Sequence, residues 1–92
     1  MENKPKIQEI SEKAKAVAEA MLLKKAEGIV RIARDGNEWN VAVEVLDRKA
    51  VPDTRDILSI YAMKFDLEGD LLSYNRIAVH HRGDMEQVEE EE

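Results

Sequence analysis

Apolar residues in the first part of the chain recur at alternating intervals of three and four, which is typical of one face of an α-helix. Pro5 suits the first helical turn, and Gly28 can adopt the left-handed conformation that commonly ends a helix. We therefore expect one amphipathic helix over about residues 5–26. Its apolar stripe consists of Ile7, Ile10, Ala14, Val17 and Met21, widened by Ala18 and Leu22.

After this helix the apolar residues occupy every second position, which indicates β-strands with one buried face. Asp35-Gly36 separates two such runs and favours a type I′ hairpin turn. Pairing about this turn places Ile32 opposite Trp39, with both side chains on the apolar face. We expect the first two strands at about residues 29–34 and 38–46.

Residues 47–57 interrupt the alternation, because Pro52 cannot donate a hydrogen bond to a sheet. We interpret this segment as a structured connection with one short helical turn capped by Asp53 or Thr54. A second hairpin follows around Glu68-Gly69, with strands at about residues 58–66 and 71–81. The predicted pairs are Phe65 with Leu72, Met63 with Tyr74 and Tyr61 with Arg76 on one face, and Ile60 with Ile77 and Leu58 with Val79 on the other.

These elements predict an α+β fold, with one N-terminal helix packed on a four-stranded antiparallel sheet made of two hairpins. Residues 1–83 would form this single domain. A helix is about 10 Å wide and strands lie about 4.8 Å apart, so one helix covers only one side of such a sheet. The other side must face water or a partner.

The charge balance of the chain argues against nucleic acid as a partner. Fourteen Lys and Arg against 20 Asp and Glu give the 92 residues a formal net charge of −6. Binding to phosphates, or to an anionic membrane, requires concentrated positive charge. Residues 84–92 carry Glu86 and Glu89 to Glu92, so we expect an acidic, disordered tail after the domain.

The chain has no cysteine, which excludes disulfides and thiolate metal sites and indicates a reducing compartment. No apolar run approaches the roughly 20 residues of a membrane span, and no apolar signal core follows the first residues. We expect a cytoplasmic protein without a membrane partner.

Few residues offer catalytic or metal chemistry. His80-His81 with Asp84 or Glu86 is the cluster most similar to a metal site, but neighbouring strand residues point to opposite faces. The hydroxyl side chains lie in no nucleophile motif, and the four glycines are scattered singly, unlike a phosphate-binding loop. We therefore predict no enzyme activity, no metal and no cofactor.

The sheet face not covered by the helix is the expected recognition surface, since an apolar patch beside charge is typical of a docking site. The open sheet edges offer strand addition as a second mode. One alternative is a self-associating domain that forms a homodimer, and another is a small-ligand or enzyme domain with a pocket between helix and sheet near Trp39 and Tyr74. The candidate partner-binding residues are Ile60, Ile77, Glu44, Arg76 and Leu58.

Several motifs extend in a fixed order over residues 39–83 and together resemble one known family. They are Trp39-x-Val41-x-Val43-Glu44-Val45, Arg48, Pro52-Asp53-Thr54-x-Asp56-Ile57-Leu58, Tyr61, Asp66, Gly69, Leu72, Tyr74, Arg76 and Arg82-Gly83. The pattern is similar to that of the gas vesicle protein GvpO family, from which Ala62-Met63 and Val79-His80 depart.

The resemblance implies a non-enzymatic accessory or minor protein of gas vesicle formation, cytoplasmic and associated with gas vesicles. Its partners would be the gas vesicle shell protein or other gas vesicle accessory proteins. No cofactor belongs to that role.

Overall fold

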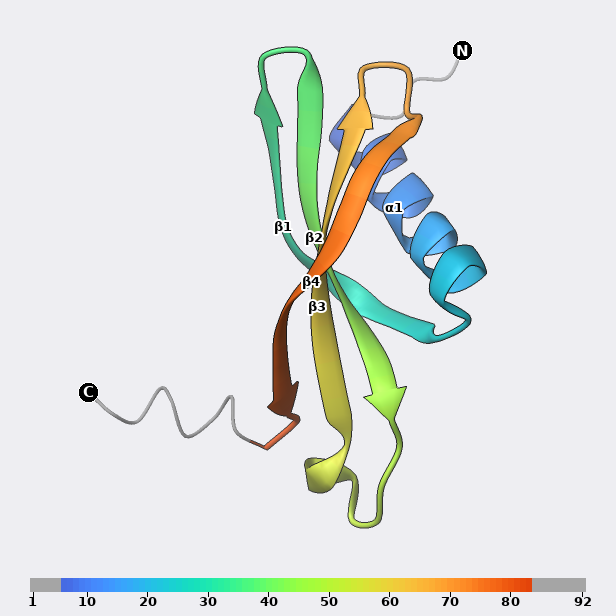
Figure 1. Ribbon diagram of the computed structural model, residues 1–92, viewed down its shortest axis with the longest axis vertical. Coiled ribbons are helices and arrows are strands. Elements are labelled where there is room, and N and C mark those ends of the chain that lie inside the picture. Colours follow the sequence, from blue (N-terminus) through green and yellow to red (C-terminus); the bar gives the residue numbers. More distant parts are fainter. Residues whose placement is uncertain (1–5, 84–92) are drawn as a thin grey trace, which may run out of the picture.

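The computed structural model describes residues 6–83 and shows one helix followed by four strands (Figure 1). The strands form one antiparallel sheet in the order β1-β2-β3-β4. The predicted α+β fold is confirmed, whereas Pro5 and the acidic segment 84–92 lie outside the described residues. The elements are α1 (Lys6–Leu22), β1 (Lys25–Asp35), β2 (Glu38–Arg48), the 3₁₀ turn Asp53–Arg55, β3 (Ile57–Asp66) and β4 (Leu71–His81).

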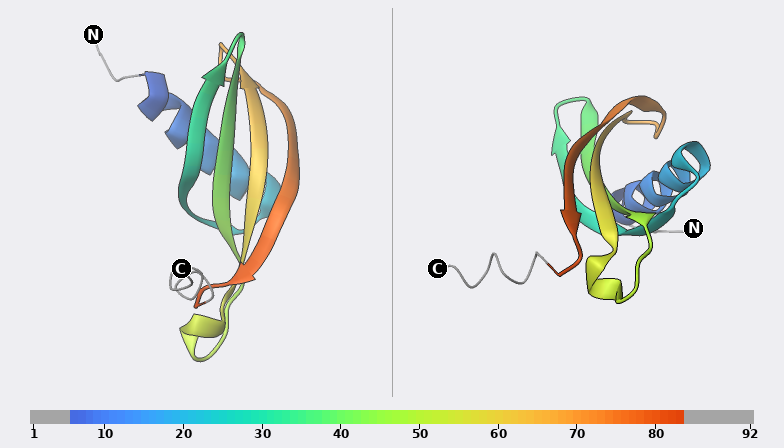
Figure 2. Two further views of the ribbon diagram at one scale, coloured as in Figure 1. Left: turned by 90° about the vertical axis from the view of Figure 1, so that its left-hand side faces the viewer. Right: turned by 60° about the horizontal axis from the view of Figure 1, so that its bottom comes forward.

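The core lies between α1 and one side of the sheet, which we call the helix face. Helix α1 contacts mainly β1 and β2, and Figure 2 shows it running obliquely along one side of the curved sheet. Alternate residues of β2 and β3 point toward the helix, as strand geometry requires. The buried cluster consists of Ile10, Ala14 and Ala18 of the helix with Trp39, Val41, Val43, Val45, Met63 and Phe65 of the sheet.

The ends of the predicted helix stripe are not buried. Ile10, Ala14 and Ala18 are buried at intervals of four, while Ile7 and Met21 are both exposed. The buried positions occupy the middle of α1, where the small alanine side chains let its backbone approach the sheet closely. Toward the ends of the helix Ile7 and Met21 stay in solvent, whereas Leu22 is partly buried against the core cluster.

The helix also ends earlier than predicted. It stops at Leu22, and Leu23 takes the left-handed backbone conformation, with φ at 58° and its N–H donating to the Glu19 carbonyl at 3.0 Å. Gly28, predicted to end the helix, instead lies in β1 beside an irregularity in the pairing with β2. The chain must turn immediately because β1 begins at Lys25, before the alternating apolar pattern becomes visible in the sequence.

The first hairpin turns one residue later than predicted. Asp35 pairs with Glu38, so Gly36-Asn37 forms the two-residue loop. Among the loop residues only Gly36 has a positive φ, 64°, as a type II′ turn requires at its first central position. Trp39 consequently lies opposite Arg34 rather than Ile32. This shift moves each partner by two positions, so Ile32 and Trp39 keep the face predicted for them. Val30, which the alternation places with them, is instead an extra residue of β1 between Ile29 and Arg31 in the pairing with β2, and it is 55% exposed.

The predicted register of the second hairpin is confirmed in the middle and wrong at both ends. Met63 pairs with Tyr74 and Tyr61 with Arg76. Toward the turn Phe65 pairs with Leu71, and toward the other end Ile60 pairs with Ala78 and Leu58 with His80. The reason is that β4 carries two extra residues, Leu72 and Ile77, as bulges opposite β3.

Replacing Leu23 with glycine is expected to stabilise the protein by about 0.5 to 1 kcal/mol. A left-handed conformation costs an ordinary residue about 1–2 kcal/mol, and glycine avoids most of this at a smaller entropic cost. The Leu23 side chain is 85% exposed, so little packing is lost. Urea denaturation of Leu23→Gly and Leu23→Ala tests this, because alanine removes the same side chain and keeps the strain. Equal midpoints for the two variants would contradict a strained backbone at position 23.

Candidate functional site

The sheet side opposite the helix face, which we call the open face, carries the candidate partner-binding surface. Helix α1 leaves this side uncovered (Figure 2). Its middle combines small, polar and apolar side chains in rows that cross the strands. It is formed by Arg31 of β1, Asn40, Ala42 and Glu44 of β2, Ile60, Ala62 and Lys64 of β3, and Ser73, Asn75 and Ile77 of β4.

Three of the five candidate partner-binding residues lie together on the open face. Glu44 is directly opposite Ile60 in the pairing of β2 with β3. Ile77 is the bulged residue of β4 next to Ala78, the partner of Ile60, and it is 56% exposed. Oε2 of Glu44 lies 3.2 Å from Nε2 of His80, without hydrogen-bond alignment. The open face therefore presents apolar side chains beside a carboxylate.

The other two candidates do not belong to this surface. Leu58 is only 1% exposed, so a docked partner has no access to it. Arg76 lies on the helix face opposite Tyr61, with Nη1 3.7 Å from Oδ2 of Asp47. The alternation of side chains along β4 separates it from Ile77, because the two residues are adjacent in the chain.

Asp47 gathers several groups on the helix face. The hydroxyl of the fully buried Ser59 donates to Oδ2 of Asp47 at 2.6 Å, and Nζ of Lys24 lies 3.1 Å from Oδ1. The Ser59 hydrogen bond is the main cause that lowers the pKa of Asp47, aided by Lys24 and Arg76 and opposed by burial. This group ties the end of α1 to the strands.

One end of the open face is closed by Glu27, Asp56 and Arg82, which we call the Arg82 cluster. Nη2 and Nε of Arg82 donate to Oδ2 of Asp56 at 2.9 and 3.2 Å, and Nη1 donates to Oε1 of Glu27 at 3.3 Å. Glu27 belongs to β1 and Arg82 follows β4, so the cluster links the two edge strands of the sheet. Its three members are far apart in the sequence, and no spacing rule predicts their meeting.

The connection between β2 and β3 is held by the same cluster. Asp56 is 2% exposed, and its Oδ1 accepts the N–H of Ala50 at 2.7 Å. The N–H of Arg82 donates to the Asp56 carbonyl at 2.9 Å, and the N–H of Gly83 donates to that of Thr54 at 3.0 Å. The predicted short helical turn is confirmed, although no side chain caps it.

The charges of the Arg82 cluster stabilise one another. The pKa of the Asp56 carboxyl is lowered, first by the hydrogen bond from Ala50 and then by the Arg82 guanidinium, against an opposing effect of burial. The pKa of Arg82 is raised by Asp56 and then by Glu27. Both ions are therefore favoured in the folded protein.

The other part of the open face contains a hollow of about 320 Å³. It is lined by Arg31, Asn40, Ala42, Ala62, Lys64 and Asn75, among others. This hollow differs in place from the pocket that the small-ligand alternative predicts between helix and sheet. Trp39 is buried in the core on the opposite face, and Tyr74 lies in ring contact with Tyr61, with centroids 6.3 Å apart.

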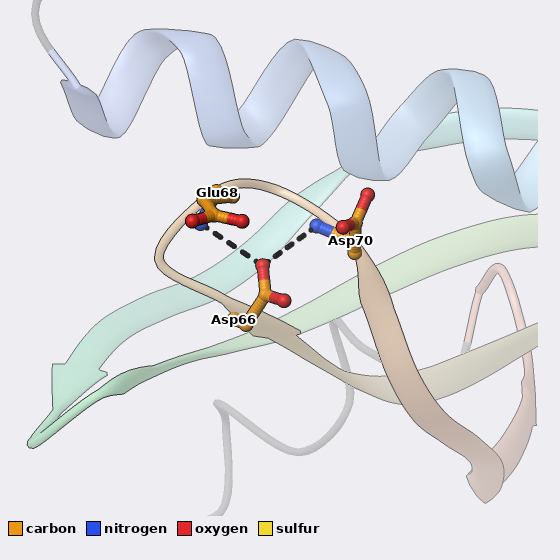
Figure 3. A group of neighbouring side chains, drawn as sticks. All are labelled: Asp66, Glu68 and Asp70. Atoms are coloured by element: carbon orange, nitrogen blue, oxygen red, sulfur yellow. Dashed lines mark hydrogen bonds between the residues drawn. The ribbon is translucent and has the colours of Figure 1, made fainter.

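Three carboxylates gather in the β3–β4 turn, within 4.8 Å of one another (Figure 3). Oδ1 of Asp66 accepts the N–H groups of Glu68 and Asp70, both at 2.9 Å. These hydrogen bonds shape the turn and account for the position of Asp66 without a metal. At the other end of β4, His80 and His81 follow each other in the strand, and Asp84 and Glu86, the acidic residues considered with them, lie outside the described residues.

The geometry defines a small α+β domain with one helix-covered and one open sheet face. The chain belongs to the gas vesicle synthesis protein GvpO family, whose model matches residues 1–86. The family resemblance inferred from residues 39–83 is thereby confirmed. No solved structure matches the chain. No helix within residues 6–83 has the length and apolar character to cross a membrane.

Several curated proteins are similar to this chain. Gas vesicle protein O of Haloferax mediterranei is 37% identical over 76 residues, which cover 82% of this chain and 54% of that protein. Gas vesicle protein O1 of Halobacterium salinarum is 35% identical over 75 residues, 82% of this chain and 63% of that protein. Gas vesicle protein O of a Streptomyces species is 36% identical over 58 residues, 63% of this chain and 45% of that protein. The chain thus spans less than two thirds of the length of each relative.

Asp56→Asn is expected to lower the melting temperature by at least about 5 °C, because the buried carboxylate accepts from both Ala50 and Arg82 and the amide turns one of its two acceptor oxygens into a donor. Asp53→Asn is the matched control, since Asp53 is an exposed carboxylate of the same 3₁₀ turn. Thermal unfolding followed by circular dichroism measures both. Equal melting temperatures would show that the Arg82 cluster does not stabilise the fold.

Acid is expected to destabilise the protein through Asp47 and Asp56. Both carboxyls have a pKa below the ordinary 3.8 in the folded state, so near pH 4 the unfolded chain takes up protons that the folded protein does not bind. Their contribution is complete above about pH 5 and is lost as the pH falls through 3.8 toward their folded pKa values. Urea midpoints between pH 3 and 7 measure this. The variant Asp47→Asn with Asp56→Asn should be less stable at pH 7 and show a shallower acid slope, and an unchanged slope would contradict the assignment.

Proposed function

We propose that this protein acts in gas vesicle formation as a non-catalytic accessory protein that binds another gas vesicle protein, the shell protein or a further accessory protein, through its open face. The family membership supports the vesicle role. The observation that carries the binding role is the half-exposed Ile77 beside Ile60 and Glu44, on the sheet side that α1 does not cover. Exposure of these apolar side chains to water is unfavourable, so a protein that covers the open face is stabilised by the burial of apolar surface.

The hydrogen bonds of two serine hydroxyls agree with a role without catalysis. Ser59 is fully buried and donates to Asp47, and Ser11 donates to the carbonyl of Ile7 at 3.0 Å. Neither hydroxyl is paired with a base that could activate it on an accessible surface. The proposed mechanism is therefore recognition of a partner.

The shape of β4 favours binding by the sheet face over strand addition at its edge. The bulges at Leu72 and Ile77 interrupt the regular ladder of this edge strand, and bulges of this kind hinder pairing with a further strand. Exposed apolar side chains nevertheless lie along the strand, among them Tyr74 and Val79. The homodimer expected as an alternative stays a prediction, with the open face as its contact surface.

The variant Ile60→Glu with Ile77→Glu is expected to abolish rescue of buoyant vesicles in a vesicle-forming host that lacks this protein. Two carboxylates on the open face would have to be desolvated when a partner docks, which costs several kcal/mol. Flotation and electron microscopy of the host give the readout, together with capture of gas vesicle proteins by the tagged chain.

The control is Val51→Glu with Val79→Glu, which adds the same charge at exposed apolar positions away from the open face. Val79 lies on β4 opposite Ser59 and therefore faces the helix side. Circular dichroism must show that both double variants are folded. Full rescue by the Ile60 and Ile77 variant, or loss of rescue by the control as well, would refute the open face as the binding surface.

A further inference from the structure

We infer that the hollow on the open face is a binding site for an extended acidic segment of a partner protein. The inference rests on the proposed function and deepens it, because it names the chemistry that the open face recognises. Four features carry it: the small floor of the hollow, its two cations, an amide oxygen without a donor, and an exposed apolar wall.

The floor of the hollow is made by two alanines. Ala42 and Ala62 are direct partners across β2 and β3, and in the same row Arg31 lies opposite Ala42 and Asn75 opposite Ala62. Small side chains on the two central strands, with longer ones on both edge strands, leave a trough that crosses the sheet. A single extended backbone fits a trough of about 320 Å³, whereas a helix about 10 Å wide does not enter it.

The charge of the hollow is opposite to that of the whole chain. Arg31 and Lys64 both line it and no carboxylate does, in a protein of net charge −6. Within residues 6–83 Arg31 makes no ion pair, and Lys64 has only the exposed Glu38, at 3.8 Å. Two available cations around an apolar floor favour carboxylate side chains of a ligand.

Asn40 adds a requirement for a hydrogen-bond donor. It lies in the row next to the alanines, opposite Lys64, and lines the hollow. Its Oδ1 is buried and accepts no hydrogen bond within the part of the chain that the structure describes. A buried acceptor without a donor is unfavourable, and a backbone N–H of a bound peptide would satisfy it.

The spacing of the cations defines the ligand further. Arg31 on β1 and Lys64 on β3 lie in neighbouring rows, two strand spacings across the sheet and two residues along it, so their Cα positions are about 12 Å apart. Side chains three or four residues apart in an extended peptide span about 10–13 Å. The expected ligand therefore carries acidic residues at such intervals, with an apolar residue against Ile77 on β4.

Fluorescence polarisation of a labelled eight-residue peptide that alternates aspartate and leucine tests the inference with the full chain. We expect salt-sensitive binding, and at least about tenfold weaker binding of the peptide in which asparagine replaces aspartate. Arg31→Glu with Lys64→Glu should weaken binding at least about tenfold, and Ala42→Leu should weaken it by filling the floor while the charges remain. Lys15→Glu with Arg48→Glu is the control of equal charge change at exposed positions, and should leave binding within about twofold.

Equal binding of the two peptides, or equal loss in the cation variant and its control, would overturn the inference. A full chain with Glu86 and Glu89 to Glu92 changed to glutamine distinguishes the other acidic occupant, this chain's own C-terminal segment. Binding that appears only in that variant would assign the hollow to this segment and overturn the proposed partner. The peptide assay is independent of the vesicle rescue experiment. If the peptide does not bind but the Ile60 and Ile77 variant still fails to rescue vesicles, this inference is wrong and the proposed function is retained.

Discussion

The coverage that one helix gives to four strands determines how this protein is organised. Four strands span nearly 20 Å, and α1, about 10 Å wide, contacts mainly β1 and β2. The buried cluster is consequently a single layer in which two alanines, Ala14 and Ala18, bring the helix backbone close to β2. Strand β4 receives no such cover, and most of its side chains remain exposed on both faces. Any further burial of this sheet has to come from polar side chains of the chain itself or from another molecule.

The Arg82 cluster provides such polar burial within the chain, but only at one end of the open face. Arg82 spans from Asp56 to Glu27, and so links the connection before β3 and both edge strands without a second helix. Leu58 is buried at this end even though it does not belong to the cluster under the helix. Residues 6–83 give the remainder of the open face no such cover, which is why the hollow and the exposed Ile77 are found there. The end covered by the Arg82 cluster and the end with the hollow thus have the same cause, because one helix cannot cover the whole sheet.

The sequence was sufficient for the parts of the fold that depend on periodicity. The helix, the four strands and most side chains on the helix face could be predicted, because a turn displaced from Asp35-Gly36 to Gly36-Asn37 keeps the alternation of faces. The bulges at Leu72 and Ile77 could not be predicted, because an extra residue changes the backbone hydrogen bonding without a visible change in the pattern of apolar residues. The early end of α1 could not be predicted either, because Leu23 takes the left-handed conformation expected of glycine. The Arg82 cluster joins residues up to 55 positions apart, beyond any local signal.

The motifs that carry the family resemblance serve mostly the framework of the domain. Asp56 and Arg82 form an ion pair whose carboxylate is buried, and Gly83 lies so close to the carbonyl of Thr54 that an added Cβ would be 3.3 Å from it. The residues around the hollow contribute differently: Arg31, Lys64 and Ile77 stand outside those motifs and make few contacts within the described chain. A framework of buried pairs and backbone bonds can hold such a surface in place whatever side chains the surface carries. The motifs therefore identify the family, whereas the chemistry of the partner has to be inferred from the side chains that the framework leaves unpaired.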